Sequence, residues 1–384
     1  MVTAASLSRR HFLAGAGMTL AAPFMVGKAQ AAEIELVDML GRSVTLKQAP
    51  RRIVLLEARD IVTMGFLVDD PSALVVGWAA VDRIDSDVLR AQYARKDNIA
   101  IAEVGKQAAD TLSLEGILSL LPDLVVANPF MVPGGKEGQL VERLESFGIP
   151  LIFSGSQDNA GDGSDLPPPT KMLPQLLRMW GRLLGPDAAA RAEHYITFAD
   201  AHIGRVAARL KGVKAKKTYL EVMSTYDDCC WAAGRRIWGD LLGLAGGMPL
   251  EGVKSPWYEK LQTEYLMQEQ PAAYIATGGG YASAIRPAIG PGLALEEGMD
   301  GLRKLIARPG FEALDAVQAK RVYGIWSGLI TVEPLNVVFV EVVAKWLHPA
   351  LFEDLDPAVT LSEINTQFNA KPISGPLWVG LEAS

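Results

Sequence analysis

Residues 170–212 read TKMLPQLLRMWGRLLGPDAAARAEHYITFADAHIGRVAARLKG, and this stretch decides the fold. In its second half, apolar residues recur every three or four positions, which predicts a helix with one buried face. The residues of that face are Ala192, Tyr195, Ala199, Ile203, Val206 and Leu210. Gly185-Pro186-Asp187 is typical of a helix start, and Gly212 favours a stop.

A helix from Pro186 to Lys211 would be roughly 39 Å long at 1.5 Å per residue. A helix of that length near the middle of the chain can join two lobes at a nearly fixed spacing. An ordinary packed helix inside one large domain fits the same pattern, so the periodicity leaves both arrangements open.

Short apolar segments alternate with helical patterns on both sides of this stretch, after a hairpin pattern at residues 33–46. We expect strands at residues 52–57, 73–78, 124–127, 150–154, 218–223, 272–277 and 321–326. We expect helices at residues 60–68, 113–121, 138–147, 237–245, 263–270, 293–306, 335–347 and 361–368. Buried strands separated by helices indicate mainly parallel sheets with both faces covered. The predicted fold class is therefore α/β, with two lobes joined by one long helix.

Composition shifts divide the chain. Residues 155–169 are rich in Gly, Asp, Ser and Pro, which is typical of a loop leaving a lobe. We expect a signal peptide at 1–31, an N-terminal α/β lobe at 32–170, a linking helical segment at 171–212 and a C-terminal α/β lobe at 213–384.

The N-terminus has the pattern of a twin-arginine signal peptide. Residues 8–13 read SRRHFL, a weakly apolar run follows over 13–26, and residues 29–31 read AQA, a small-x-small cleavage site. We expect the mature chain to begin near Ala32 and to be free in the periplasm, because no cysteine follows the run to carry a lipid. An amphipathic helix that stays attached is the alternative.

Composition excludes several classes of protein. The chain has 384 residues, long enough for two cores, and 49% are hydrophobic, which excludes a disordered chain. A net charge of −7 argues against a general affinity for nucleic acid or acidic membranes. The 2 cysteines, Cys229 and Cys230, are adjacent and close no long loop. They are either packed thiols or a redox-active or ligand-facing pair.

Several segments resemble, in order, the periplasmic substrate-binding proteins of ABC importers for ferric siderophores, haem and cobalamin. They are VDMLGR at 37–42, the block from Ser-Leu-Glu at 113–115 to LPDLV at 121–125, LAGG at 244–247 and AKWLHP at 344–349. The resemblance covers essentially the mature chain. It implies two Rossmann-like lobes joined by one long helix, with the ligand held in the cleft between them.

The resemblance also implies how the protein meets its membrane partner. In that family, one carboxylate on top of each lobe pairs with arginines of the ABC permease. By position these are Glu115 and Glu264, each near the start of an expected helix, where a carboxylate is favoured. The alternative is that both are ordinary solvated glutamates. We expect a monomer.

The candidate ligand residues follow the ends of expected strands, where open α/β sheets bind ligands. A large anionic chelate needs arginines for charge and aromatic rings for flat contact. The candidates are Arg59, Trp78, Phe130, Tyr226, Trp231, Arg235, Arg236, Tyr281, Arg286 and Trp326, with Asn128 and Met131 beside Phe130.

No metal or cofactor site of the protein's own is expected. The mature chain has only His194, His202 and His348, and their spacing does not give two histidines with a carboxylate. Surface or packing roles are favoured for them, so any metal would arrive already chelated. The sequence also has no phosphate-binding loop or dinucleotide fingerprint, and Ser327 is one position late for a nucleophile elbow.

The predicted function is capture of an iron chelate, similar to a ferric siderophore, and its delivery to an ABC permease without catalysis. Cobalamin, haem or another metal chelate is the alternative cargo. A periplasmic enzyme on the same bilobal fold, or a sensor subunit that presents its ligand to a receptor, are the alternative functions.

Overall fold

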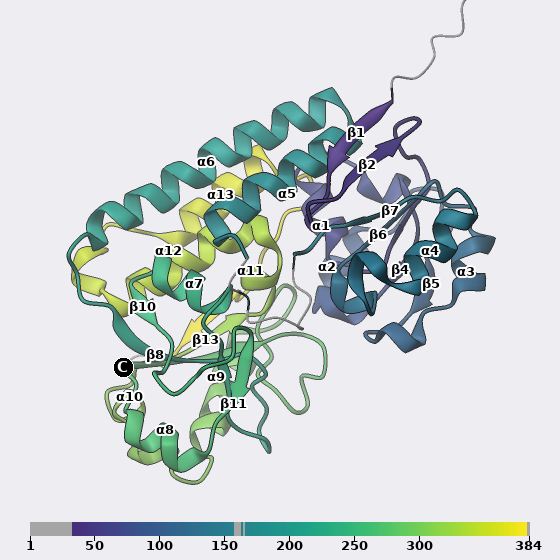
Figure 1. Ribbon diagram of the computed structural model, residues 1–384. Coiled ribbons are helices and arrows are strands. Elements are labelled where there is room, and N and C mark those ends of the chain that lie inside the picture. Colours follow the sequence, from purple (N-terminus) through teal and green to yellow (C-terminus); the bar gives the residue numbers. More distant parts are fainter. Residues whose placement is uncertain (1–32, 157–162, 164–165, 382–384) are drawn as a thin grey trace, which may run out of the picture.

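The computed structural model describes residues 33–156, 163 and 166–381 (Figure 1). The expected signal peptide lies outside the described residues, as does most of the expected loop at 155–169. None of the described helices is both long and apolar enough to cross a membrane.

The described part of the chain begins with a hairpin of β1 (Ile34–Val37) and β2 (Ser43–Leu46), which pair antiparallel as the sequence predicts. The side chain of Asp38 fixes its turn. One carboxylate oxygen accepts from the backbone N–H of Leu40 and of Arg42, both at 3.0 Å. The other accepts from the backbone N–H of Phe153 at 3.2 Å, which attaches the hairpin to the first sheet.

The first sheet has five parallel strands in the order β5-β4-β3-β6-β7. They are β3 (Ile53–Leu55), β4 (Val75–Ala79), β5 (Ala102–Gly105), β6 (Leu124–Ala127) and β7 (Leu151–Phe153). The helices between them are α1 (Asp60–Gly65), α2 (Asp87–Gln92), α3 (Leu114–Ser119) and α4 (Gln139–Ser146). The central strand β3 is fully buried, as expected of a strand with helices on both faces.

Two helices in tandem, α5 (Pro169–Leu184) and α6 (Pro186–Leu210), follow this lobe. Gly185 separates them with φ +108°, a backbone angle that glycine adopts readily. They pack closely because Gly181 has no side chain, and a Cβ there would lie 2.8 Å from the Cα of Ala189. At 25 residues, α6 is roughly 37 Å long.

The buried face of α6 contains four of the six residues that the periodicity picks out, while Ile203 and Leu210 are half-buried. Tyr195 on this face touches both halves of the molecule. Its ring packs 5.1 Å from the ring of Phe66 in the first lobe, and its hydroxyl donates to the carbonyl of Pro334 in the second. In Figure 1, α6 runs from beside the hairpin across the helices α12 and α13 of the second half.

The second sheet is mixed, in the order β11-β9-β8-β12-β13-β14, with β10 (Gly247–Met248) beside β8. Its parallel core is β8 (Lys216–Glu221), β12 (Ala273–Gly278) and β13 (Val322–Trp326). Antiparallel strands flank that core: β9 (Trp231–Ala233), β11 (Tyr258–Lys260) and β14 (Trp378–Gly380).

The helices of the second lobe are α7 (Trp238–Leu244), α8 (Thr263–Glu269), α9 (Leu295–Ile306), α10 (Asp315–Gln318), α11 (Gly328–Thr331), α12 (Asn336–Leu347) and α13 (Pro357–Gln367). Five of them match predicted helices, and the two short helices α10 and α11 were not expected. The molecule is thus two α/β lobes with separate sheets, linked by the α5–α6 pair, as the sequence predicts. The exact domain boundaries stay a prediction.

Candidate functional site

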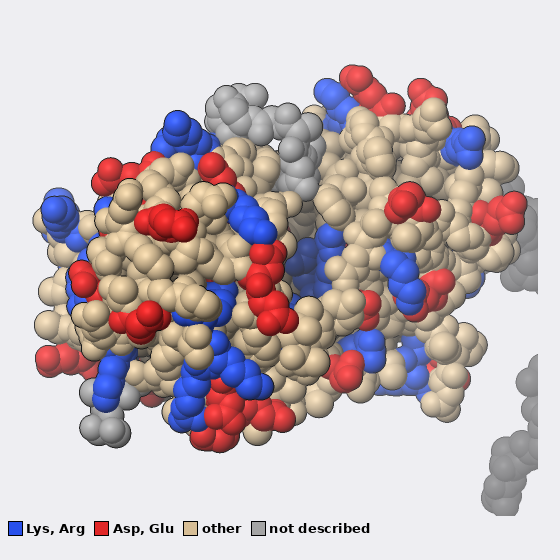
Figure 2. Space-filling view, turned by 90° about the horizontal axis from the view of Figure 1, so that it is seen from below, with Lys and Arg blue, Asp and Glu red and all other residues tan. Residues whose placement is uncertain are grey.

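A cavity of about 490 Å³ lies between the two lobes. Residues of both lobes line it, together with Pro169 and Met172 from the start of α5. In Figure 2 the hollow separates the two halves of the molecule, and blue lysine or arginine side chains lie deep inside it.

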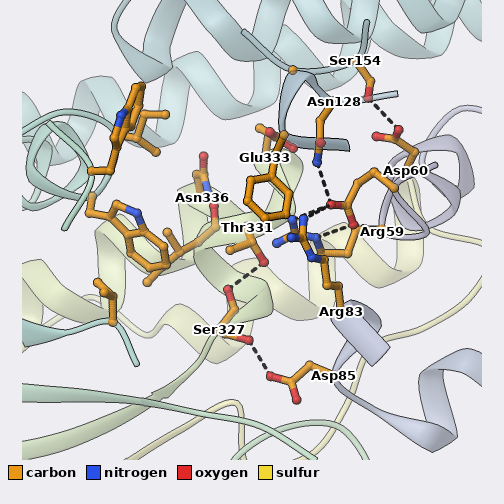
Figure 3. Close-up of a pocket in the computed structure, with 18 of the residues that line it drawn as sticks. Arg59, Asp60, Arg83, Asp85, Asn128, Ser154, Ser327, Thr331, Glu333 and Asn336 are labelled. Atoms are coloured by element: carbon orange, nitrogen blue, oxygen red, sulfur yellow. Dashed lines mark hydrogen bonds and ion pairs between the residues drawn. The ribbon is translucent and has the colours of Figure 1, made fainter. Parts of the chain in front are cut away.

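The wall from the N-terminal lobe is built around Glu57, which follows β3. Arg59, just before α1, donates from Nε and Nη2 to the two carboxylate oxygens of Glu57, each at 2.8 Å. Arg83, in a short helix that follows β4, donates to Glu57 Oε2 at 2.8 Å, and Asn128, after β6, donates to it at 2.9 Å. Three neighbouring strands therefore end at one polar cluster, as is usual at the carboxyl ends of a parallel sheet (Figure 3).

The two arginines of this cluster keep the Glu57 carboxyl group ionised. Burial alone would raise the pKa of Glu57, but the charges and hydrogen bonds of Arg59 and Arg83 lower it to about 2. The carboxylate is thus ionised, and the three side chains carry one net positive charge. Arg83 also lies over the ring of Phe130, 4.8 Å from its centroid, which fixes the guanidinium plane.

Burial raises the pKa of three other carboxyl groups of the cleft, Asp60, Asp85 and Glu333. Burial raises the pKa of Asp60 well above its ordinary value, although Ser154 donates to it at 2.6 Å. Burial also raises the pKa of Glu333, in the second lobe, to about 7. Figure 3 shows Glu333 and Thr331 on the side of the cavity that faces Arg59 and Arg83.

The wall from the C-terminal lobe is mostly apolar. Its side chains come from the end of β8, the start of α7, β11 and α11, and they are Val222, Met223, Ile237, Trp238, Trp257, Tyr258 and Ile330. Trp257 is only 9% exposed, and its indole N–H has no hydrogen-bond partner among the described residues. These side chains offer flat contact area, whereas Arg286 and Glu333 are the charged residues that the same lobe adds to the lining.

Asp85 connects the two lobes at one side of the cleft. Its carboxylate accepts from the backbone N–H of Tyr281 at 2.9 Å, from Ser327 Oγ at 2.6 Å and from Arg286 at 3.3 Å. The Asp85 carboxylate comes so close to the backbone of residue 279 that only glycine fits there, because a Cβ would lie 1.8 Å from the carboxylate. We call Asp85, Tyr281, Arg286 and Ser327 the inter-lobe bridge.

Four of the ten candidate ligand residues line the cavity: Arg59, Phe130, Tyr281 and Arg286. Asn128 joins them, while Met131 is buried in the core of the N-terminal lobe. Trp78 and Trp326 are instead part of the hydrophobic core.

The other four candidates lie outside the lining of the cavity. Three of them interact with their own lobe, while Arg236 also donates to the carbonyls of Gly163 and Leu166, which precede the linking helices. The Tyr226 hydroxyl donates to the carbonyl of Arg286 at 2.8 Å. Trp231 donates to Asp228 at 3.1 Å. Arg235 donates to the carbonyl of Val253 at 2.8 Å, and Arg236 pairs with Asp240 at 3.1 Å.

The most consequential residues that the sequence did not single out are Glu57, Arg83, Asp85, Trp238, Trp257 and Glu333. Glu57 and Arg83 could have been found from the sequence. Each follows a strand, and the ends of these and the neighbouring strands also supply Arg59 and Asn128. Trp257 could not have been found in this way, because it precedes β11, an edge strand of the sheet that was not expected.

Glu115 and Glu264 are exposed and lie in the first turns of α3 and α8. Their contact with a permease stays a prediction. Cys229 and Cys230 form a disulfide with each other, and neither is among the described residues that line the cavity.

The histidines pack against protein groups. His202 is buried, with Nδ1 2.7 Å from Glu341 Oε1, and His348 Nε2 lies 2.9 Å from the carbonyl of Gly246. His194 packs edge-on against Phe368. Over the described ranges, no group of three or more His, Cys, Asp or Glu side chains could hold a metal ion.

Comparisons with known proteins agree with this architecture. The family model described as periplasmic binding protein matches residues 67–327. No curated protein matches the sequence. A TroA-like periplasmic binding protein, FepB from Veillonella parvula, is 22% identical, with a TM-score of 0.75 over 91% of this chain and 100% of that chain.

Two other solved structures share the fold at low identity. The molybdate-binding protein MolA of Haemophilus influenzae is 16% identical, with a TM-score of 0.68 over 89% of this chain and 99% of that one. A periplasmic heme-binding protein from Pseudomonas aeruginosa is 19% identical, with a TM-score of 0.57 over 87% and 99%. Because the family model spans well over half of the sequence, this chain belongs to the periplasmic binding protein family.

Proposed function

We propose that this protein captures an iron chelate, similar to a ferric siderophore, in the periplasm and delivers it to an ABC permease. The observation that carries the proposal is the cleft itself. A polar cluster centred on Glu57, Arg59 and Arg83 faces a wall that includes Trp238 and Trp257. A cavity of about 490 Å³ separates the two. A chelate combines oxygen ligands around its metal with an organic shell, and both surfaces find a matching wall.

Family membership supports a role in transport, and the proposed cycle is reversible binding, limited lobe closure and release at the permease. The cleft's polar groups are held by one another rather than arranged as a nucleophile with its base, so we propose no catalysis. The structural relatives bind chemically different cargoes, as their names state for molybdate and heme, so cobalamin, haem and other chelates stay alternatives.

Delivery is proposed to involve Glu115 and Glu264, one exposed carboxylate on each lobe. The export signal at residues 1–31 and a monomeric state complete the proposal. A carboxylate near a helix start is favoured by the backbone N–H groups there and is free to meet an arginine of a partner.

The cargo is identified by purifying the protein from the periplasm of its own host and recording the mass and absorption spectra of what co-purifies. We expect a metal chelate at close to one per protein. A metal-free preparation that also ignores a panel of ferric chelates would overturn the proposal.

The docking role is tested with the double variant Glu115→Ala/Glu264→Ala in the host. We expect uptake of the chelate to fall at least tenfold while binding to the purified protein stays the same, because neither residue lines the cavity. A matched control is Glu142→Ala/Glu312→Ala, which removes two other exposed carboxylates and should leave uptake intact. Unchanged uptake in the first variant would overturn the docking assignment.

A further inference from the structure

The charges in the cleft restrict the kind of chelate that it can hold. We propose that the cargo is electrically neutral or nearly so, with an apolar shell and exposed oxygen acceptors, and that the cleft discriminates against polyanionic chelates. This inference rests on the proposed function and narrows the class of its cargo.

The first support is the balance of charged side chains. The described residues that line the cavity carry five carboxyl groups and three guanidinium groups, a formal balance of −2, and include no lysine or histidine. The carboxyl groups are Glu57, Asp60, Asp82, Asp85 and Glu333, and the guanidinium groups are Arg59, Arg83 and Arg286.

Each of the three arginines already has an anionic partner. Arg59 and Arg83 share Glu57, at 2.8 Å each, and Arg286 lies 3.3 Å from Asp85. The Glu57 cluster leaves one excess positive charge, which suits a single partial negative charge such as that of metal-bound oxygen. A trianion would bring three charges into a confined space where at most one is compensated, and the repulsion from Asp82 and Glu333 would add to that cost.

Protonation of the carboxyl groups does not give the cleft enough positive charge to balance a trianion. Burial raises the pKa of Asp60 well above its ordinary value and that of Glu333 to about 7, so both can be uncharged near neutral pH. With both protonated, the lining is neutral overall rather than positive. Burial also raises the pKa of Asp85, and with all three carboxyl groups protonated the lining carries one net positive charge. That is still fewer than the three negative charges of a trianion.

The second support is the apolar surface around the mouth of the cavity. Four large side chains that line it are unusually exposed: Phe130 at 44%, Met223 at 41%, Tyr258 at 41% and Tyr281 at 48%. Together with Trp238 and Trp257 they form a surface that a bulky apolar group can cover with loss of water from both partners.

The third support is a pair of unsatisfied donors. The Trp257 indole N–H and the Ser156 hydroxyl are buried and have no hydrogen-bond partner among the described residues, and both residues line the cavity. A buried donor without a partner is costly, and a ligand oxygen would relieve that cost. Uncharged donors suit neutral acceptors such as carbonyl or hydroxamate oxygens.

The test compares chelates of one metal that differ in charge. A gallium(III) tris-hydroxamate is neutral, because three singly charged ligand groups balance the metal, whereas a gallium(III) tris-catecholate carries −3. Purified protein is titrated by calorimetry at pH 7.5 with one linear and one cyclic tris-hydroxamate and with one tris-catecholate. We expect at least one neutral complex to bind ten or more times more tightly than the trianion.

A charge variant sharpens the result. Asp82→Asn/Glu333→Gln removes two carboxyl groups from the cleft, and we expect it to move the ratio of the two affinities about tenfold towards the trianion. The control Glu312→Gln/Glu353→Gln changes the total charge equally at exposed positions outside the cavity and should leave the ratio within about twofold.

The outcomes separate the two claims. Equal or tighter binding of the trianion by the unaltered protein overturns the inference and leaves the proposed function standing. An unchanged ratio in the cleft variant also overturns the inference, because the charges would then not govern selection. Failure of every chelate to bind overturns the proposed function, and the inference with it.

Discussion

The two walls of the cleft use different physics. On the N-terminal wall, Glu57 joins Arg59, Arg83 and Asn128 through hydrogen bonds of 2.8 to 2.9 Å, so the cluster is arranged before any ligand arrives. The C-terminal wall is mostly aromatic and aliphatic, and one of its donors, on Trp257, has no partner among the described residues. The N-terminal wall orients a polar group of the ligand. The C-terminal wall contributes apolar surface, which stabilises the complex only when the ligand covers it.

The largest effect is expected from the variant Glu57→Gln. It leaves two arginines close together without their shared carboxylate, and breaking a buried ion pair in this way costs about 3 kcal/mol. We expect the free energy of unfolding, measured by urea denaturation, to fall by that amount. The control Glu103→Gln breaks a pair with Lys106 that is exposed, so a loss of under about 0.5 kcal/mol is expected.

The same carboxylate predicts a dependence of stability on pH. The pKa of Glu57 is about 2 in the folded protein, below its ordinary value of 4.5. A lowered carboxyl pKa contributes stability that is complete above about pH 5 and is lost as the pH falls towards 2. Glu57→Gln should therefore remove part of the acid-induced loss of stability between pH 5 and 2. Parallel curves for the variant and the unaltered protein would contradict the assignment.

The apolar wall should affect binding more than stability. Trp238 is half-buried at the start of α7 and lines the cavity. Trp238→Ala is expected to weaken binding of a neutral chelate about tenfold or more, since burying a large side chain contributes about 2 kcal/mol. Calorimetric titration measures this effect. Trp231→Ala, on β9 but outside the lining of the cavity, is the control and should bind normally.

The inter-lobe bridge predicts a smaller and more local effect. Asp85→Ala removes the acceptor for Tyr281, Arg286 and Ser327, and we expect a loss of about 1 to 2 kcal/mol. Hydrogen exchange of the backbone N–H of Tyr281 should become faster. Asp87→Ala, two residues on, breaks only an exposed pair with Arg90 and should leave that exchange unchanged. If both variants behave alike, the bridge does not hold the lobes together.

The fold was largely predictable because its signals are local. The apolar period of α6 and the short buried runs of β6 and β12 each depend on residues close together in the chain. The antiparallel strands β9, β11 and β14 were not expected, because they are three residues long and pair through contacts between distant segments.

The site was less predictable because the position of a residue after a strand does not fix the direction of its side chain. Arg59 and Trp326 both stand at strand ends, yet Arg59 lines the cavity and Trp326 is fully buried in the core. Arg235 instead satisfies a backbone carbonyl of its own lobe. Partnerships of this kind depend on the folded arrangement of loops, which local pattern does not encode.

A crystal structure of the protein with a neutral gallium(III) tris-hydroxamate tests the central claim most directly. We expect the metal complex between the two walls, with its oxygens towards Arg59 and Arg83 and its organic shell against Trp238 and Trp257. A complex bound elsewhere on the molecule, with the cavity between the lobes left open, would contradict it.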